Sequence, residues 1–258
     1  MSTIKRIVSK EHEGRKIREF LKEELGLSSR LIRSASIDKR IFVDNKAVKM
    51  NYVLKRSEEV LIDLVKEETQ NIDPENIPID IVYEDEDIIV VNKGPNMVVH
   101  PTKRYQSGTL ANALMYYFKE SNQKCIVRLV SRLDMDTSGL IIIAKNQYAH
   151  MELSKEMTLN NVEKRYLTVV HGHMENDSDL VECLLETGRT HQIRVHLSSL
   201  GHPIWGDTLY GYEEDGEIIS RQALHAYGLD FKSPRTKKEL SLRARVPDDI
   251  EKLVEYLK

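Results

Sequence analysis

Residues 131–145 read SRLDMDTSGLIIIAK, a polar cluster that runs directly into an apolar stretch. Arg132, Asp134 and Asp136 stand at the edge of LIIIA, where burial is near and an unpaired charge is costly. A buried strand would hold the preceding loop at a fixed point, so a carboxylate on that loop could act as a nucleophile or a general base. The alternative is an ordinary turn whose polar side chains only satisfy backbone groups. Spacing alone leaves both interpretations open.

A second polar stretch, LETGRTHQIRVHLSSLGHPIWGD at 185–207, could supply the partner that an isolated carboxylate needs. Its spacing predicts a turn into a helix, with Thr190 as N-cap, and Gly201 with Pro203 as the stop. Arg189 would then lie beside free backbone N–H groups, where it could keep Asp134 ionised. An arginine on a solvated helix end is the alternative. The helix is expected to turn three residues toward the core: Ile193, Leu197 and Leu200.

Other chemistries have less support in the sequence. His191 and His196 are five residues apart, which fits neither one helix face nor one strand face, so no metal site is predicted. There is no glycine loop of the nucleotide-binding type and no GxSxG motif. A glycosidase-like pair formed by Asp134 and Asp136 remains an alternative. The patterns therefore favour acid–base or nucleophilic work by a carboxylate, with no cofactor.

The elements that must position these residues fall into two parts. In residues 1–66, apolar spacing predicts helices in GRKIREFLKEELG and SSRLIRSASIDK, then strands around an Asp44-Asn45 turn and in EEVLIDLV. Residues 67–78 are polar, contain two prolines and read as a flexible linker. The remainder, 79–258, alternates short strands with a few helices, including a strand pair in IDIVYEDEDIIVVNK and a helix in TLANALMYYFKE. This pattern predicts an α+β protein whose larger part is a mixed, mostly antiparallel sheet with peripheral helices.

Composition limits the class of protein. At 258 residues with 40% apolar and 31% charged residues, the chain can build a sizeable core. No apolar run approaches the ~20 residues of a membrane span, and the first residues, MSTIKRIVSKEHEGRK, have no apolar h-region, so they are not expected to be a secretory signal. With Cys125 and Cys183 as its only cysteines, it is expected to be cytoplasmic. Residues 1–60 hold 15 Lys and Arg against 9 Asp and Glu, whereas the remainder has a net charge of −9, so a basic module joins an acidic body.

The motifs of the larger part resemble those of the RluA-type pseudouridine synthases, which isomerise uridine in ribosomal or transfer RNA. SRLDMDTSGL resembles the family signature H-R-L-D-x-x-T-S-G-L, and GRTHQIRVHL, GHPIWGD, YG and RQALHAYGLDF follow in the family's order. The resemblance spans roughly residues 80–245. One departure is Ser131 in place of the common histidine, which is expected to alter substrate fit and leave the chemistry intact.

Residues 1–66 resemble the alpha-L RNA-binding module named after ribosomal protein S-four. The stretch SSRLIRSASIDKRIFVDNKAV follows that module's pattern, with Lys-Arg in place of the glycine region and Asp-Asn in place of Asn-Gly. The resemblance implies that basic side chains of this module contact phosphates. The alternative is a solvated basic helix face. The candidate RNA contacts are Arg30, Arg33, Lys39 and Arg40.

The family resemblance also implies roles in the larger part. Asp134 takes the place of the catalytic aspartate, Arg189 that of its basic partner, and Tyr166 that of the tyrosine that packs on the uracil. Arg132 takes the place of the arginine that fills the gap left by a flipped nucleotide. Ser131 and Thr137 complete the expected substrate contacts.

The function implied is cofactor-free isomerisation of uridine to pseudouridine in structured RNA by a monomer that needs neither metal nor membrane. Ribosomal RNA is the first choice of substrate, and transfer RNA is the alternative. A non-catalytic RNA-binding or ribosome-assembly protein is the competing hypothesis.

Overall fold

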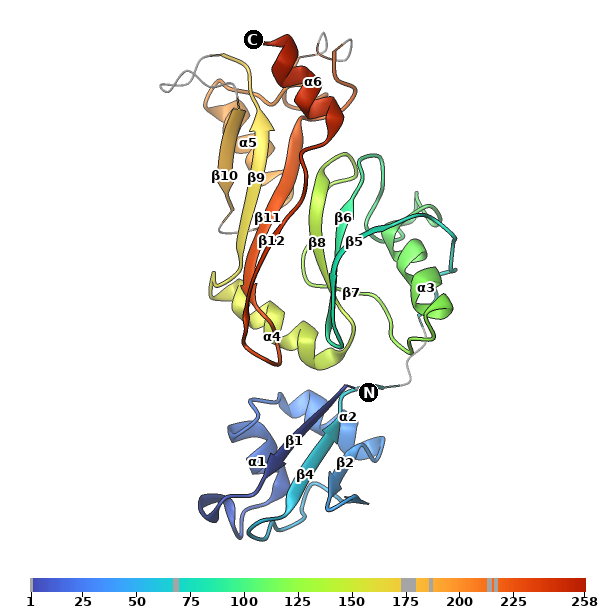
Figure 1. The fold of residues 1–258 in the computed structure, drawn as a ribbon, viewed down its shortest axis with the longest axis vertical. Helices are drawn as coiled ribbons and strands as arrows, with labels where there is room; N and C mark the ends of the chain where they lie inside the picture. Colours follow the sequence, from blue (N-terminus) through green and yellow to red (C-terminus); the bar gives the residue numbers. More distant parts are fainter. Residues whose placement is uncertain (1, 67–69, 173–179, 186–187, 213–214, 216–217) are drawn as a thin grey trace.

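The computed structural model describes residues 2–66, 70–172, 180–185, 188–212, 215 and 218–258. They form two sheets, one of four strands in the order β1-β4-β2-β3 and one of eight strands (Figure 1). Helices lie around both sheets, which confirms the predicted α+β class. Among the described residues, no helix is both long enough and apolar enough to cross a bilayer.

The four-stranded sheet and its helices make up an N-terminal unit, residues 2–66. Helix α1 (Ile17–Glu23) and helix α2 (Ser29–Ile37) form where apolar spacing predicted them. The Ser28 hydroxyl accepts a hydrogen bond of 3.2 Å from the Leu31 amide, which caps α2 as expected from the paired serines. The strands are β1 (Thr3–Ile7), β2 (Ile41–Val43), β3 (Lys46–Ala47) and β4 (Glu59–Asp63).

Two turns in this unit show how its sequence replaces glycine. Asp44 and Asn45 connect β2 to β3 with φ of 46° and 64°, the left-handed conformation that a tight hairpin requires. Lys39, where the S-four-like pattern has its glycine region, also has a positive φ of 54°. Short polar side chains tolerate this region better than others, so the Asp-Asn turn is the less strained of the two.

The predicted linker is anchored along the described residues 70–78. It contains no helix or strand, but Ile72 is buried in the same cluster as Leu110 and Phe118. The Asn112 side chain donates to the Asp73 carbonyl at 2.8 Å. This segment therefore packs on α3 (Leu110–Glu120) and is not the flexible link that its composition suggested. Residues 67–69 lie outside the described part.

The larger sheet has the strand order β10-β9-β11-β8-β6-β5, with β12 beside β11 and β7 beside β8. Among the described residues, the strand pairs of this sheet are antiparallel except β11 with β8, as expected for a mixed, mostly antiparallel sheet. Two helices that complete it, α5 and α6, lie at the end far from the N-terminal unit (Figure 1). The elements are β5 (Asp80–Glu84), β6 (Ile88–Lys93), β7 (Arg128–Leu129), β8 (Ser138–Ala144), α4 (Gln147–Thr158), β9 (Glu163–Val169), β10 (Leu180–Leu184), α5 (Gln192–Ser199), β11 (Leu224–Lys232), β12 (Glu239–Arg243) and α6 (Asp248–Tyr256).

Strand β8 explains why LIIIA is continuously apolar. Its side chains alternate between two buried clusters: Ile141 and Ile143 pack with α3, whereas Leu140, Ile142 and Ala144 pack with α4. A strand covered on both faces needs apolar residues at every position. The loop before β8 therefore starts from a rigid base.

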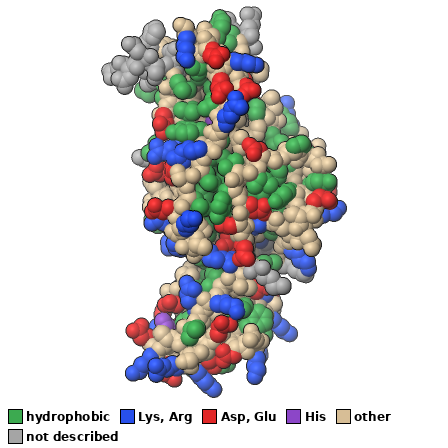
Figure 2. All heavy atoms as spheres, viewed as in Figure 1, with side chains coloured by type: hydrophobic (Ala, Val, Ile, Leu, Met, Phe, Trp, Pro, Cys, Tyr) green, Lys and Arg blue, Asp and Glu red, His purple; other side chains and the backbone are tan. Residues whose placement is uncertain are grey.

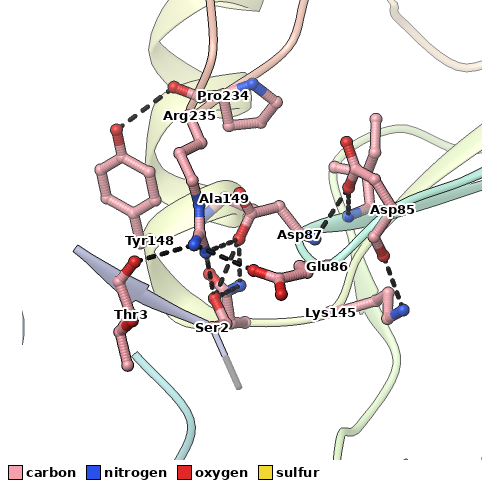
Figure 3. A network of polar contacts seen from close by, with 12 residues as sticks. Ser2, Thr3, Asp85, Glu86, Asp87, Lys145, Tyr148, Ala149, Pro234 and Arg235 are labelled. Carbon is pink, nitrogen blue, oxygen red and sulfur yellow. Dashed lines mark hydrogen bonds and ion pairs between the residues drawn. The ribbon is translucent and has the colours of Figure 1, made fainter. Parts of the chain in front are cut away.

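The N-terminal unit is attached to the body through α4 and a polar network (Figure 3). Tyr148 and Met151 of α4 join the apolar cluster of the N-terminal unit. Asp87, 2% exposed, accepts hydrogen bonds from Ser2 at 3.1 Å and from two nitrogens of Arg235 at 2.7 and 2.8 Å. Arg235 also donates to the Thr3 carbonyl at 2.8 Å. A buried carboxylate with these partners holds β1 against the body.

Two of the elements that the sequence did not predict individually are strand β1 and helix α4. Strand β1 begins almost at the N-terminus, where charged residues interrupt the alternation, and it forms by pairing with β4. Helix α4 is weakly amphipathic because polar Gln147 and Ser154 share one face with two methionines. Tertiary packing on β8 and on the N-terminal unit stabilises it.

Candidate active site

The loop before β8 is held by a buried lysine. Lys93 is 1% exposed, and its ammonium donates to the carbonyls of Gly94, Met97 and Met135 at 2.7, 3.0 and 2.9 Å. Burial lowers the pKa of Lys93 to about 7, an effect that nearby Asp136 opposes. Met135 follows Asp134 directly, so this contact fixes the backbone beside the candidate carboxylate.

The strand end of the loop is also fixed. Gly139 has φ +114°, and a Cβ on it would lie 2.3 Å from the Ala226 carbonyl oxygen of β11, so only glycine fits this close approach. The Ser138 hydroxyl and the His225 ring nitrogen Nδ1 are 2.9 Å apart. Thr137 is 2% exposed, and its hydroxyl accepts from Gln222 at 3.2 Å. These contacts place Asp134 at the end of a rigid turn.

Asp134 is paired with a guanidinium. Its Oδ2 lies 3.4 Å from Nη1 of Arg194 in the first turn of α5. Arg194 is 7% exposed and forms a bidentate pair with fully buried Asp207, with both N–O distances at 2.7 Å. Burial works against the charge of Arg194, but Asp207 and then Asp134 raise its pKa. Asp207 thus orients Arg194, and Arg194 faces Asp134.

Arg189, which was expected in this role, lies elsewhere in the site. It is exposed and borders the same pocket as Asp134, but within the described residues it forms no ion pair with it. The helix begins later than predicted, because His191 in the left-handed conformation is its N-cap and Thr190 precedes it. Leu200 is 69% exposed, so only Ile193 and Leu197 of the expected three face the core. Because of the turn before α5, Arg194 and not Arg189 lies within ion-pair distance of Asp134.

A signal for Arg194 was present in the sequence. It lies between Ile193 and Leu197 on the buried side of the helix, and a charge at such a position needs a buried partner. The partner Asp207, thirteen residues later, could not be found from helical spacing because it lies in a loop.

Two aromatic side chains border Asp134. Tyr166 on β9 is 7% exposed, and burial followed by the charge of Asp134 raises its pKa. Its phenol therefore stays neutral where it lines the pocket. His191 Nε2 lies 3.7 Å from Oδ2 of Asp134, and its Nδ1 lies 3.2 Å from the hydroxyl of Tyr210. This second neighbour was not predicted.

A central pocket brings these residues together. Its volume is about 60 Å³, and Arg132, Asp134, Thr137, Tyr166, Arg189 and Arg194 are among its lining residues. Larger hollows of about 540 and 480 Å³ adjoin it, and Arg132 borders all three. Ser131 lines the 480 Å³ hollow and is absent from the lining of the central pocket. Arg132 is exposed, which leaves its side chain accessible from each hollow.

The two-carboxylate alternative finds no support in this geometry. Asp136 does not line the central pocket, and one of its oxygens is buried without a hydrogen bond. Within the described ranges, no group of three His, Cys, Asp or Glu side chains is arranged to hold a metal ion. Of these two carboxylates, Asp134 is the one that lines the pocket.

The basic residues of the N-terminal unit divide into two kinds. Arg30, Arg33 and Lys39 are exposed. Arg40 differs, since it is 8% exposed and its guanidinium donates to the Asp63 carbonyl at 2.6 Å and to Asp38 at 3.3 Å. The expected phosphate contact by Arg40 does not fit this position, because its charge is used inside the unit.

The fold and the site define a class of protein: an α+β body in which an arginine-paired aspartate and a tyrosine line one pocket together with further arginines. Comparison with known proteins identifies the family. Residues 87–180 match the family model described as RNA pseudouridylate synthase. The chain is 34% identical to the Bacillus subtilis protein "Uncharacterized RNA pseudouridine synthase YjbO", covering 90% of this chain and 95% of that one. It is also 34% identical to "Ribosomal large subunit pseudouridine synthase D" of Zymomonas mobilis, covering 72% and 74%.

A solved structure supports the fold. The human protein "RNA Pseudouridylate Synthase Domain Containing 4" superposes with a TM-score of 0.56 at 19% identity, covering 69% of this chain and 92% of that one. The chain belongs to the RNA pseudouridine synthases of the RluA type, and it is an enzyme of that family.

Proposed function

We propose that this enzyme converts uridine to pseudouridine in structured RNA with Asp134 as the catalytic carboxylate. The observation that carries the proposal is the ion pair between Asp134 and Arg194 in a pocket bordered by Tyr166. The reaction breaks the bond from ribose to ring nitrogen and forms one from ribose to carbon 5, so atoms are conserved. The pair keeps Asp134 ionised, as either attack on the sugar or removal of a ribose proton requires.

We infer the roles of the other pocket residues from their positions. Tyr166 packs its neutral ring on the uracil, a contact worth ~1–3 kcal/mol for base stacking on an aromatic side chain. Arg194 takes the pairing role first expected of Arg189, and Arg189 contacts RNA at the pocket rim. Thr137 shapes the loop from its buried position, and Ser131 contacts the strand in the adjoining hollow.

The direct test replaces Asp134 with asparagine. Asp134→Asn keeps the shape and removes the charge, so pseudouridine formation should fall below detection while the protein stays folded. Asp136→Asn, two residues further along the same loop and outside the pocket lining, serves as the matched control and should retain activity. Release of free uracil by the wild type would contradict the proposal, because isomerisation leaves the mass of the RNA unchanged.

Arg132 is proposed to occupy the space left by a flipped nucleotide. It is exposed and borders all three hollows, and a planar cation can fill a base-sized gap and contact phosphate. Arg132→Ala should slow turnover on duplex RNA more than on an unpaired oligonucleotide, because only the duplex must lose stacking. Equal losses on the two substrates would argue against this role.

We further infer the domain division and the substrate. Residues 1–66 act as an RNA-binding module, 67–78 as its connection and 79–258 as the catalytic domain. The exposed Arg30, Arg33 and Lys39 support RNA contact by the module. Several relatives are named for the ribosomal large subunit, which supports ribosomal RNA as the substrate. The enzyme would then work as a cytoplasmic monomer, and mapping pseudouridines in cells with and without the gene would distinguish ribosomal from transfer RNA.

A further inference from the structure

One face of α4 forms a surface that the proposed reaction does not explain. Its first half borders a hollow of about 360 Å³, together with Arg30 of α2 and Arg128 of β7. Its second half borders the 480 Å³ hollow, together with Arg132, Lys164 and Tyr166. The residues recur at three- and four-residue intervals, so they share one side of the helix. They are Gln147, His150, Met151, Ser154, Met157 and Thr158.

This face connects the N-terminal unit to the catalytic pocket. The 480 Å³ hollow shares Arg132, Tyr166, Leu185 and Gly188 with the central pocket. From residue 147 to residue 158 an α-helix rises about 17 Å. Measured along the axis of a duplex, where one strand carries a phosphate about every 3.4 Å, that length corresponds to roughly five phosphates, and to fewer in an extended strand. Figure 1 shows α4 lying between the N-terminal unit and the large sheet.

The two sides of α4 differ in charge. No carboxylate lines either hollow on the first face among the described residues, although the whole chain has 41 Asp and Glu against 38 Lys and Arg. The opposite side contributes Glu152 and Glu156 to a separate cavity of about 630 Å³ between the two units, with Lys155 beside them. Carboxylates are thus segregated away from the face that leads to the pocket. Such segregation favours a polyanionic ligand.

Lys164 gives the second observation. It is half-buried on β9 and lines the hollow beside Tyr166. Within the described part of the chain its ammonium has no ion pair or hydrogen bond. Burial lowers the pKa of Lys164, since desolvation is not offset by a counter-charge. An anion bound in this hollow would supply the counter-charge that the described residues do not provide.

We propose that this face of α4 is a track for the phosphodiester backbone of the substrate RNA, running from Arg30 to the catalytic pocket, with Lys164 binding a phosphate next to Tyr166. The identity of the ligand rests on the proposed function. The track explains how a strand held by the N-terminal unit reaches Asp134. It also places Ser131, the departure from the family histidine, along the bound strand.

The test measures binding of a labelled single-stranded oligouridine by fluorescence anisotropy over a range of salt concentrations. Lys164→Gln should weaken binding severalfold and reduce the slope of log Kd against log salt by about 0.7, the value for one phosphate on a single strand. Ser154→Glu places a carboxylate on the track and should also weaken binding. Lys155→Gln, on the opposite side of the same helix, is the matched control and should bind like the wild type.

Several outcomes would overturn the track. Wild-type affinity and slope in both Lys164→Gln and Ser154→Glu would exclude it, as would an equal loss in Lys155→Gln. If Lys164→Gln fails to fold, Ser154→Glu and Arg30→Gln decide the matter, because both change partly or fully exposed positions. Pseudouridine formation by the wild type is scored separately. An active wild type with unaffected track variants would refute the track alone, whereas an inactive wild type with weakened track variants would refute the proposed function alone.

Discussion

Asp134 is oriented by a series of charged groups: Asp207 binds Arg194, and Arg194 contacts Asp134. Asp207 receives two N–H groups from Arg194 and two from backbone amides at 3.0 and 3.1 Å, so its position is determined. Arg194 then has one nitrogen left for Asp134. Because burial alone would raise the pKa of Asp207, the lowered pKa reflects the hydrogen bonds from Arg194 and the backbone. The carboxylate of Asp134, proposed to be catalytic, is thereby oriented by Arg194.

Arg194 and Arg189 should respond differently to removal. Arg194→Ala leaves buried Asp207 unpaired, which should cost about 3–5 kcal/mol of unfolding free energy and abolish turnover. Arg189→Ala should mainly raise KM, because its side chain is exposed at the pocket rim. Denaturant unfolding and single-turnover pseudouridine assays measure both effects. A larger loss of kcat in Arg189→Ala than in Arg194→Ala would reverse the assignment.

Lys93 should make stability depend on pH. Its pKa is about 7 in the fold and ordinarily 10.5, so between these values the unfolded chain binds more protons than the folded one. Unfolding free energy should therefore rise with pH from 7 toward 10 relative to Lys93→Met, which cannot titrate. Lys93→Met should itself cost roughly 3 kcal/mol by leaving three carbonyls without their donor. Parallel pH profiles of the two proteins would contradict this prediction.

At the scale of elements, the contact between β8 and β11 decides whether the site exists. These are the neighbouring parallel strands of the large sheet, and Gly139 lies at their closest approach. Asp134 comes from the loop before β8, whereas Gln222, Arg221 and His225 brace that loop from the β11 side. A shift of one strand against the other would move the aspartate away from α5.

Gly139→Ala tests that contact. The added Cβ would overlap the Ala226 carbonyl, and the φ of +114° is unfavourable for alanine, so we expect a loss of at least about 3 kcal/mol. Gly94→Ala is the matched control, because its Cβ would meet nothing within 4 Å and its φ is not positive. Thermal unfolding of the two variants gives the comparison. Equal stability of the two would show that the strands can move apart without cost.

At the scale of the molecule, the N-terminal unit is fastened to the catalytic body. Hydrogen bonds among Ser2, Asp87 and Arg235 connect the start of strand β1 to the loop between β11 and β12 (Figure 3). Figure 2 shows Lys and Arg side chains, interspersed with Asp and Glu, on the visible face of this unit at one end of an elongated molecule. A fixed orientation of the N-terminal unit would keep its proposed RNA contacts aligned with the proposed track on α4.

Arg235→Ala should loosen this attachment. It leaves Asp87 buried with a reduced set of partners, which should cost about 3–5 kcal/mol. RNA affinity should fall more for a long structured substrate than for a short oligonucleotide that reaches only the pocket. Lys232→Ala is the control, since its 4.0 Å contact with Glu239 is exposed and weak. Undiminished affinity for long RNA in Arg235→Ala would show that the orientation is set by other contacts.

The sequence alone determined the family, the α+β class, the helices of the N-terminal unit and the loop that carries Asp134, because local periodicity and contiguous motifs encode them. It did not identify Arg194 as the partner of Asp134, the burial of Arg40, the anchoring of residues 70–78 or the role of α4 between the two units. Those features depend on residues far apart in the chain, such as Asp207 with Arg194 and Ser2 with Asp87 and Arg235. Only packing in three dimensions decides which charge meets which, because the free energy of a buried charge depends on all of its neighbours.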